Sequence, residues 1–132
     1  MSSTEPTSVD YDADSYTLST VGVGTAAADL LLDGTGTAGP LTPDNYLQRI
    51  VQLSLSNTAT VAGYVTIQAS TGGTSPTVRK LGSFNVAASS TLVLNEEMVR
   101  YIAQYNYKFQ AIASTGAFDV YATAILTKGA GR

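Results

Sequence analysis

The chain has 132 residues, of which 44% are hydrophobic and only 13% are charged, with a formal net charge of −3. This length suits a single domain with a hydrophobic core, and a lightly charged chain rich in Ser and Thr favours strands over helices. No stretch is apolar over the ~18 residues of a membrane span, and residues 1–15 lack the basic and apolar regions of a secretory signal. We therefore expect no membrane segment and no signal peptide.

The N-terminal third begins with a polar, acidic segment, residues 1–15, which has no apolar periodicity and is predicted to be an extended arm. Strands are predicted from Tyr16 and from Ala26, followed by a Gly- and Pro-containing loop over 33–40. "TPDN" from Thr42 has the pattern of a helix start, with Thr as the cap and Pro in the first turn. It predicts one helical turn ahead of a strand.

The rest of the chain alternates between apolar and polar residues with the period of β-strands. In 46–57 the alternation assigns Val51, Leu53 and Leu55 to one face, and further strands follow in 61–70, 78–86 and 90–95. A short helix is predicted in "NEEMVRYIAQ", because Asn95 can cap it and four apolar residues share a helical face: Met98, Tyr101, Ile102 and Tyr105.

A final hairpin is predicted in "YKFQAIASTGAFDVYATAIL", with an inward face made of Phe118, Val120, Ala122, Ala124 and Leu126. Six or more short strands separated by turn signals are typical of sandwiches and jelly rolls. The predicted fold is all-β: a single antiparallel β-sandwich or jelly-roll-like domain over 16–132, with an extended N-terminal arm and at most one or two short helices.

The sequence offers little for catalysis, since it contains no His and no Cys. His is the usual general base near neutral pH and the commonest metal ligand. "GVGTAA" (22–27) fits a dinucleotide-binding pattern but runs into a Gly-rich loop rather than a βαβ unit. Glu96, Glu97 and Asp119 are the only acids of the strand-rich part, and adjacent carboxylates at a helix start usually serve capping. We expect a non-enzymatic protein without a cofactor.

The acidic stretch "DYDADS" places Asp10, Asp12 and Asp14 at alternate positions, as in the start of a calcium loop. An EF-hand loop needs Gly at its sixth position and Glu at its twelfth, where this chain has Ser15 and Val21. A looser oxygen-only calcium site stays open as an alternative, but we predict no metal site.

Three regions together resemble small β-sandwich virion proteins of tailed bacteriophages, namely decoration (cement) proteins and related head, neck or tail accessory modules. The regions are "IVQLSLSNTATVAGYVTIQAS", "LGSFNVAASSTLVLNEE" and "YKFQAIASTGAFDVYATAIL", and the resemblance extends over roughly 48–127. The resemblance implies a protein of the capsid surface, made in the host cytoplasm, that binds the major capsid protein or other virion subunits. It implies no catalytic or binding residues.

The charges are divided along the chain: seven of the ten acids precede residue 49, whereas all seven basic residues lie at or after it. Opposite charges on the two parts can attract one another within a molecule or between copies. We expect a homo-oligomer. The predicted arm contacts are Asp10, Tyr11, Asp12 and Asp14, and the predicted receiving charges are Arg79, Lys80, Arg100 and Lys108. Basic residues are too few and too scattered for a nucleic-acid groove.

One alternative is a carbohydrate-binding module, in which Tyr101, Tyr105 and Tyr107 form an aromatic platform for sugar rings. These three tyrosines cluster in seven residues, and Tyr suits a position with one buried and one wet end. A neck, tail or baseplate accessory role is the other alternative.

Overall fold

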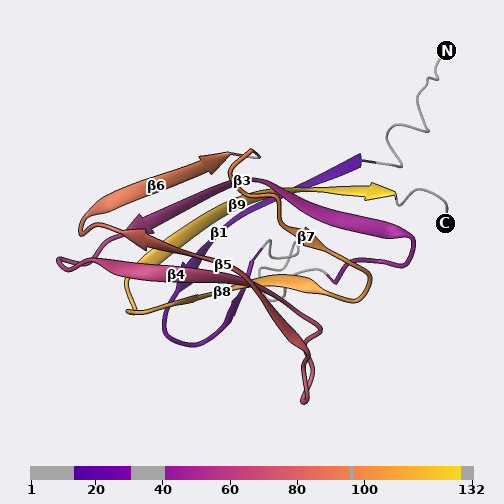
Figure 1. Ribbon diagram of the computed structural model, residues 1–132, viewed down its shortest axis with the longest axis horizontal. Coiled ribbons are helices and arrows are strands. Elements are labelled where there is room, and N and C mark those ends of the chain that lie inside the picture. Colours follow the sequence, from indigo (N-terminus) through magenta and orange to yellow (C-terminus); the bar gives the residue numbers. More distant parts are fainter. Residues whose placement is uncertain (1–13, 31–40, 96, 129–132) are drawn as a thin grey trace, which may run out of the picture.

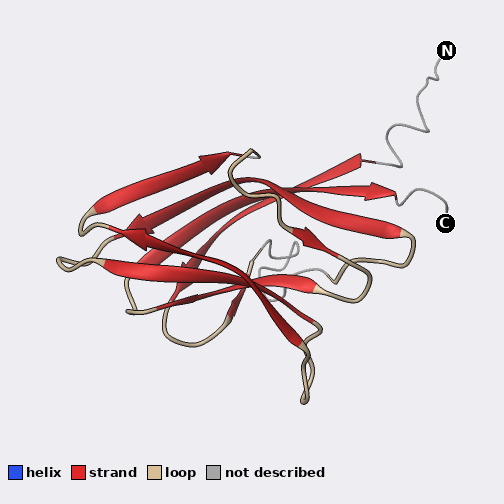
Figure 2. Ribbon diagram, in the orientation of Figure 1, coloured by secondary structure: helices blue, strands red, loops and turns tan. Residues whose placement is uncertain are grey.

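The structure is a computed structural model that describes residues 14–30, 41–95 and 97–128. In these residues the chain forms nine strands, arranged as two antiparallel sheets that face one another, and no helix (Figures 1 and 2). The predicted all-β class and sandwich arrangement are therefore confirmed.

The first sheet runs in the order β1 (Asp14–Val23), β9 (Phe118–Lys128), β3 (Tyr46–Asn57) and β6 (Ser90–Asn95). The two-residue strand β7 (Ile102–Ala103) also pairs with β3, beside β6. The second sheet runs in the order β2 (Ala28–Asp29), β8 (Lys108–Ala113), β4 (Gly63–Ser70) and β5 (Val78–Val86). On this side of the molecule β6 and β7 are thus the edge strands of the first sheet, and β5 is an edge strand of the second.

The core lies between the sheets and is built from the inward residues of the alternating strands. Of the predicted inward face of the last strand, Phe118, Val120, Ala122 and Ala124 are buried, and Leu126 is half-buried. From the second sheet, buried Val65 and Ile67 of β4 lie opposite Ala113 and Ala111 of β8 in the ladder. Removing these apolar surfaces from water is the main stabilising contribution to the fold.

The face predicted for β3 is only partly correct, because the strand contains a register shift against β9 between Ile50 and Gln52. A bulge of this kind places two residues opposite one and reverses the inward and outward alternation on its two sides. Leu53 and Leu55 are buried as predicted, but upstream it is Ile50 that is buried, and Val51 is half-exposed.

The helix predicted in "NEEMVRYIAQ" is wrong for the residues that the structure describes there. Asn95 does act as a cap, since its side-chain Oδ1 accepts hydrogen bonds from the backbone N–H groups of Glu97 (3.0 Å) and Met98 (3.2 Å). Only a single turn follows, and the chain then extends into β7. Buried Val99 and Ala103, together with the pairing of β7 to β3, outweigh the helical spacing of the predicted face.

The helical turn predicted at "TPDN" is a non-helical turn in the structure. Asp44 and Asn45 form it, with Asn45 in the left-handed region at φ 68°, and the backbone N–H of Tyr46 donates to the carbonyl of Pro43 (3.2 Å). The following strand begins at Tyr46, as the alternation predicts.

The predicted arm lies almost entirely outside the described residues, and with it Asp10, Tyr11 and Asp12. The strand β1 already begins at Asp14, two residues before the predicted start at Tyr16. Across the described segments, no helix has the length and apolar character to cross a membrane.

Candidate functional site

Two pockets meet at Ile102, on the edge of the sandwich where β7 approaches β5. We call the first the edge pocket; it has a volume of about 300 Å³. Its lining comes from both sheets and from the segment after β7: Leu47, Ala69, Arg79, Leu81, Ile102, Gln104 and Tyr107. Leu47 and Ile102 are 38% and 44% exposed, so the pocket presents apolar surface to solvent.

The second pocket, here the arginine pocket, has a similar volume of about 300 Å³ and is lined by Arg49, Glu97, Arg100 and Ile102. Three arginines therefore line the two pockets that share Ile102, and among the described lining residues Glu97 is the one carboxylate. Guanidinium groups beside apolar surface are a combination that recognises carboxylates bidentately while covering apolar side chains.

Arg79 is exposed, and its guanidinium carbon lies 5.7 Å from the centre of the Tyr107 ring. This is a cation–π distance, and the interaction holds the guanidinium over the edge pocket without neutralising its charge. Neither Arg79 nor Arg100 forms an ion pair with any described residue. Both cations thus remain able to pair with an external anion.

Tyr101 fixes the segment that carries Ile102. Its carbonyl accepts a hydrogen bond from the backbone N–H of Ile50 (3.1 Å), and its ring packs against Phe84 of β5, with centroids 6.4 Å apart. The hydroxyl lies so close to Gly82 that a Cβ at that position would overlap it. Burial raises the pKa of the Tyr101 hydroxyl above its ordinary value of 10.0, because desolvation penalises the charged form.

Thr42 fixes the turn after β7 from the other side. Its buried hydroxyl lies within hydrogen-bond distance of the carbonyl oxygens of Ala103 (3.1 Å) and Tyr107 (3.0 Å), and it accepts from Nε2 of Gln48 (3.1 Å). Backbone bonds add to this: Thr42 N–H donates to Tyr107 and Asn106 N–H donates to Thr42. Thr42 was predicted to cap a helix; instead it positions the turn that carries Gln104 and Tyr107.

The structure separates the four cations predicted to receive the arm. Arg79 lines the edge pocket and Arg100 the arginine pocket. Lys80 is exposed and lines neither of these pockets; it lies across from Gln68 in the pairing of β5 with β4. Lys108 is bonded to Asp29 within the chain.

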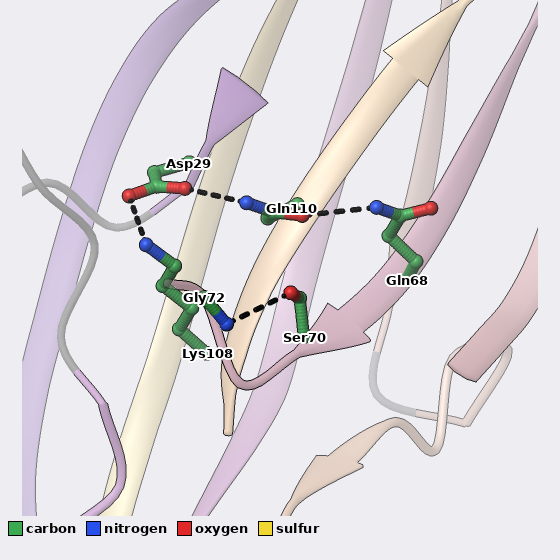
Figure 3. Close-up of polar contacts among 6 residues, drawn as sticks. All are labelled: Asp29, Gln68, Ser70, Gly72, Lys108 and Gln110. Atoms are coloured by element: carbon green, nitrogen blue, oxygen red, sulfur yellow. Dashed lines mark hydrogen bonds and ion pairs between the residues drawn. The ribbon is translucent and has the colours of Figure 1, made fainter. Parts of the chain in front are cut away.

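Lys108 belongs to a row of polar side chains that crosses the second sheet (Figure 3). Its Nζ lies 2.8 Å from Oδ2 of Asp29, and Oδ1 of Asp29 accepts from Nε2 of Gln110 (2.8 Å). Oε1 of Gln110 in turn accepts from Nε2 of Gln68 (2.9 Å). The row therefore ties β2, β8 and β4 together, and its charges neutralise one another.

The three tyrosines predicted as an aromatic platform have different environments. Tyr101 is packed against Phe84, and Tyr107 lies below the guanidinium of Arg79. Tyr105, 58% exposed, is the most open of the three. Two of the three rings are thus already engaged with other side chains.

Sequence reasoning missed Leu47, Arg49 and Ile102 as site residues. The first two lie on β3 upstream of the register shift, and Ile102 belongs to β7, which was predicted as helix. The sequence signal is the alternation of Leu47 and Arg49 with Gln48 and Ile50. These four residues are too few to show which side of the strand is exposed unless the pairing partner is known.

The carboxylates considered for catalysis and for calcium binding do not come together in the described part of the chain. Glu97 and Asp119 are exposed and lie on separate elements, while Glu96 is outside the described residues. The part of the chain that the structure covers holds no group of three or more acidic residues able to bind a metal ion. Asp10 and Asp12 of the open calcium alternative lie outside it, and no side-chain position is described for Asp14.

No protein-family model matches the chain, and a search of curated proteins finds no match. Among solved structures, the chain is similar to a subunit of Bacillus endospore appendages, which form disulfide-linked pili, with 13% identity over 89% of this chain and 88% of that one (TM-score 0.49). It is also similar to the CBM22-1–GH10 modules of Clostridium thermocellum endo-1,4-β-D-xylanase 10B, complexed with xylohexaose. There the identity is 8% over 87% of this chain and 26% of that one (TM-score 0.46). Identities this low do not indicate a function.

Proposed function

We propose that this chain is a non-enzymatic structural subunit that binds other protein subunits, including further copies of itself. The observation that carries the proposal is the surface around Ile102, where exposed apolar side chains lie beside Arg79 and Arg100. Neither arginine has a carboxylate partner among the residues described.

The composition of this surface supports a protein partner. Tyr, Met and Arg are the residue types enriched at protein interfaces, and Arg and Tyr recur among the residues that carry binding energy. Here Arg79 and Tyr107 line the edge pocket and Arg100 lines the arginine pocket. Met98 and Tyr105, exposed by 61% and 58%, lie in the same short stretch of chain as Arg100 but line neither pocket.

The finer proposal is that the assembly is a tailed-bacteriophage virion, in which the chain decorates and stabilises the capsid by contacts with the major capsid protein. The resemblance of 48–127 to decoration and accessory proteins supports it. Sequencing the DNA that flanks the gene tests it: we expect genes for capsid, portal or tail proteins in the same cluster. A metabolic or cell-wall gene cluster would contradict it.

Self-association is tested by light scattering after size exclusion over a range of protein concentrations. A molar mass above the 13.7 kDa of one chain, falling as salt is raised, is the expected result, because salt screens exposed charges over about 8 Å at physiological ionic strength. A monomer at every concentration would contradict self-assembly. Binding of oligosaccharides, lost on Tyr105→Ala, would then favour the carbohydrate-binding alternative.

A further inference from the structure

We propose that the acidic N-terminal segment of a neighbouring copy docks at the edge of the sandwich, with Tyr11 in the edge pocket and Asp10 and Asp12 paired with Arg79 and Arg100. This inference rests on the proposed assembly function and names the segment and the site through which copies join.

The chemistry of the segment matches the site. The stretch "SVDYDA" (8–13) alternates, so in an extended conformation Val9, Tyr11 and Ala13 share one side and the two aspartates the other. If the apolar side faces the pocket, the carboxylates of Asp10 and Asp12 lie on the outer side of the segment, so pairing requires the long side chains of Arg79 and Arg100 to extend outward along its two edges. Residues 1–13 contain three acids and no Lys or Arg.

The edge of the sandwich offers an apolar pocket for the aromatic ring and two arginines for the carboxylates. The edge pocket, at about 300 Å³, offers the apolar side chains of Leu47, Leu81 and Ile102 to an aromatic ring. Arg79 stands on the β5 side of this pocket, and Arg100 stands beyond Ile102 in the adjoining pocket. Acidic-motif recognition by arginines beside an apolar pocket is a recurrent mode of peptide binding.

The topology favours a neighbouring copy over the chain's own segment. Asp14 begins β1, and both β9 and β3 lie between β1 and β7. The near side of the edge pocket lies closer, because Asp14 pairs with Thr127 and Thr127 pairs with Leu47, two strand spacings or about 10 Å away. Three spacings to the strand of Ile102 amount to about 14 Å, whereas the three residues from Asp14 back to Tyr11 span at most about 11 Å. The backbone of the chain's own Tyr11 therefore reaches the Leu47 side of the pocket but not its Ile102 side. A segment from another copy has no such restriction.

Because the chain has no cysteine, introduced thiols report the contact directly. Chains carrying Val9→Cys are mixed with chains carrying Gln104→Cys, treated with a short bismaleimide, and the linked peptides are identified by mass spectrometry. Gln104 lines the edge pocket and is exposed. The matched control replaces Gln104→Cys by Thr60→Cys, an exposed site in the loop after the opposite end of β3.

We expect a Val9–Gln104 heterodimer as the main product and only background linking to Thr60. Adding Arg79→Glu and Arg100→Glu to the Gln104→Cys chain should lower the yield roughly tenfold, which corresponds to about 1.4 kcal/mol of binding free energy. Lys80→Glu makes the same charge reversal at one exposed neighbour outside both pockets, half of the total change in the double variant, and should leave the yield nearly unchanged.

Light scattering on the same samples distinguishes a failure of the docking site from a failure of the proposed assembly function. Oligomers without the Val9–Gln104 product would overturn the docking site and leave the assembly function standing. Monomers without the product would overturn both. A chain carrying both cysteines that links only within itself, as a monomer, would show that the segment covers its own edge and would overturn docking between copies.

Discussion

Lys108 and Arg79 are both cations, but Lys108 has a carboxylate partner within the chain, whereas Arg79 contacts an aromatic ring. Lys108 lies 2.8 Å from Asp29, in a row that continues through Gln110 to Gln68, and the side chains of this ion pair are 18% and 17% exposed (Figure 3). Arg79 is held over Tyr107 and has no carboxylate partner among the described residues.

The difference separates structural charges from charges available to a partner. A cation whose carboxylate comes from the same chain contributes to the fold, and removing either partner leaves the other unsatisfied. A cation held in place by an aromatic ring keeps its charge for an external anion at little cost to the fold. The two regions should therefore respond differently to substitution.

The largest effect on stability is expected at Asp29. Asp29→Ala removes the acceptor of both Lys108 and Gln110, and we expect the free energy of unfolding to fall by about 1.5–3 kcal/mol. Urea unfolding measures this. Asp44→Ala, in an exposed turn, is the control and should change stability little. Equal effects of the two substitutions would mean that the row does not stabilise the sheet.

Thr42→Val tests how the turn after β7 is held. It keeps the shape of the side chain but removes the hydroxyl that lies between Ala103, Tyr107 and Gln48, so we expect a loss of about 1–2 kcal/mol of unfolding free energy. Thr42→Ser retains the hydroxyl and should lose less. Because this turn carries part of the edge pocket, self-association should weaken with Thr42→Val as well.

The edge arginines should show the opposite behaviour. Arg79→Glu with Arg100→Glu should change the unfolding free energy by no more than about 0.5 kcal/mol per site, as exposed substitutions usually do. Oligomer formation should nevertheless fall, as seen by light scattering. A large loss of stability from this pair, greater than that of Lys80→Glu, would show that the edge arginines serve the fold.

The smallest expected effect is on the pH dependence of the unfolding free energy, through Tyr101. Its pKa is raised in the folded chain by desolvation, so the folded state holds the proton more tightly than the unfolded one. This stabilising contribution is complete below pH 10.0, the ordinary value, and is lost as pH rises through the folded pKa. Unfolding of the unmodified chain and of Tyr101→Phe, compared from pH 8 to 11, should show a steeper decline for the unmodified chain. Parallel declines would contradict the burial of the hydroxyl.

Part of this organisation could be predicted from sequence and part could not. The final hairpin was predictable because Phe118, Val120, Ala122 and Ala124 repeat with period two over a strand that packs on the core. The bulge at Val51 was not, since it depends on the register against β9. The segment 95–105 had a genuine helical period, and pairing of β7 with β3 outweighed it.

The edge site is harder still to predict, because its parts meet only in three dimensions. Arg79 was among the predicted contacts and Tyr107 among the platform tyrosines, yet nothing in the local sequence brings β5 beside the segment after β7. The same holds for Lys108: the sequence predicts it as a receiving charge, whereas the fold pairs it with Asp29. A sequence shows which residues are cations and which are anions. Only the fold shows which of them pair with each other.

The most direct test of the account is charge exchange between the arm and the edge, followed by light scattering. One variant carries Asp10→Lys and Asp12→Lys, and the other carries Arg79→Glu and Arg100→Glu. We predict that each alone associates less than the unmodified chain, and that mixing them restores association, because the reversed arm of one fits the reversed edge of the other. Unchanged association in both variants, or no recovery on mixing, would contradict the claim that Arg79 and Arg100 receive the acidic segment of another copy.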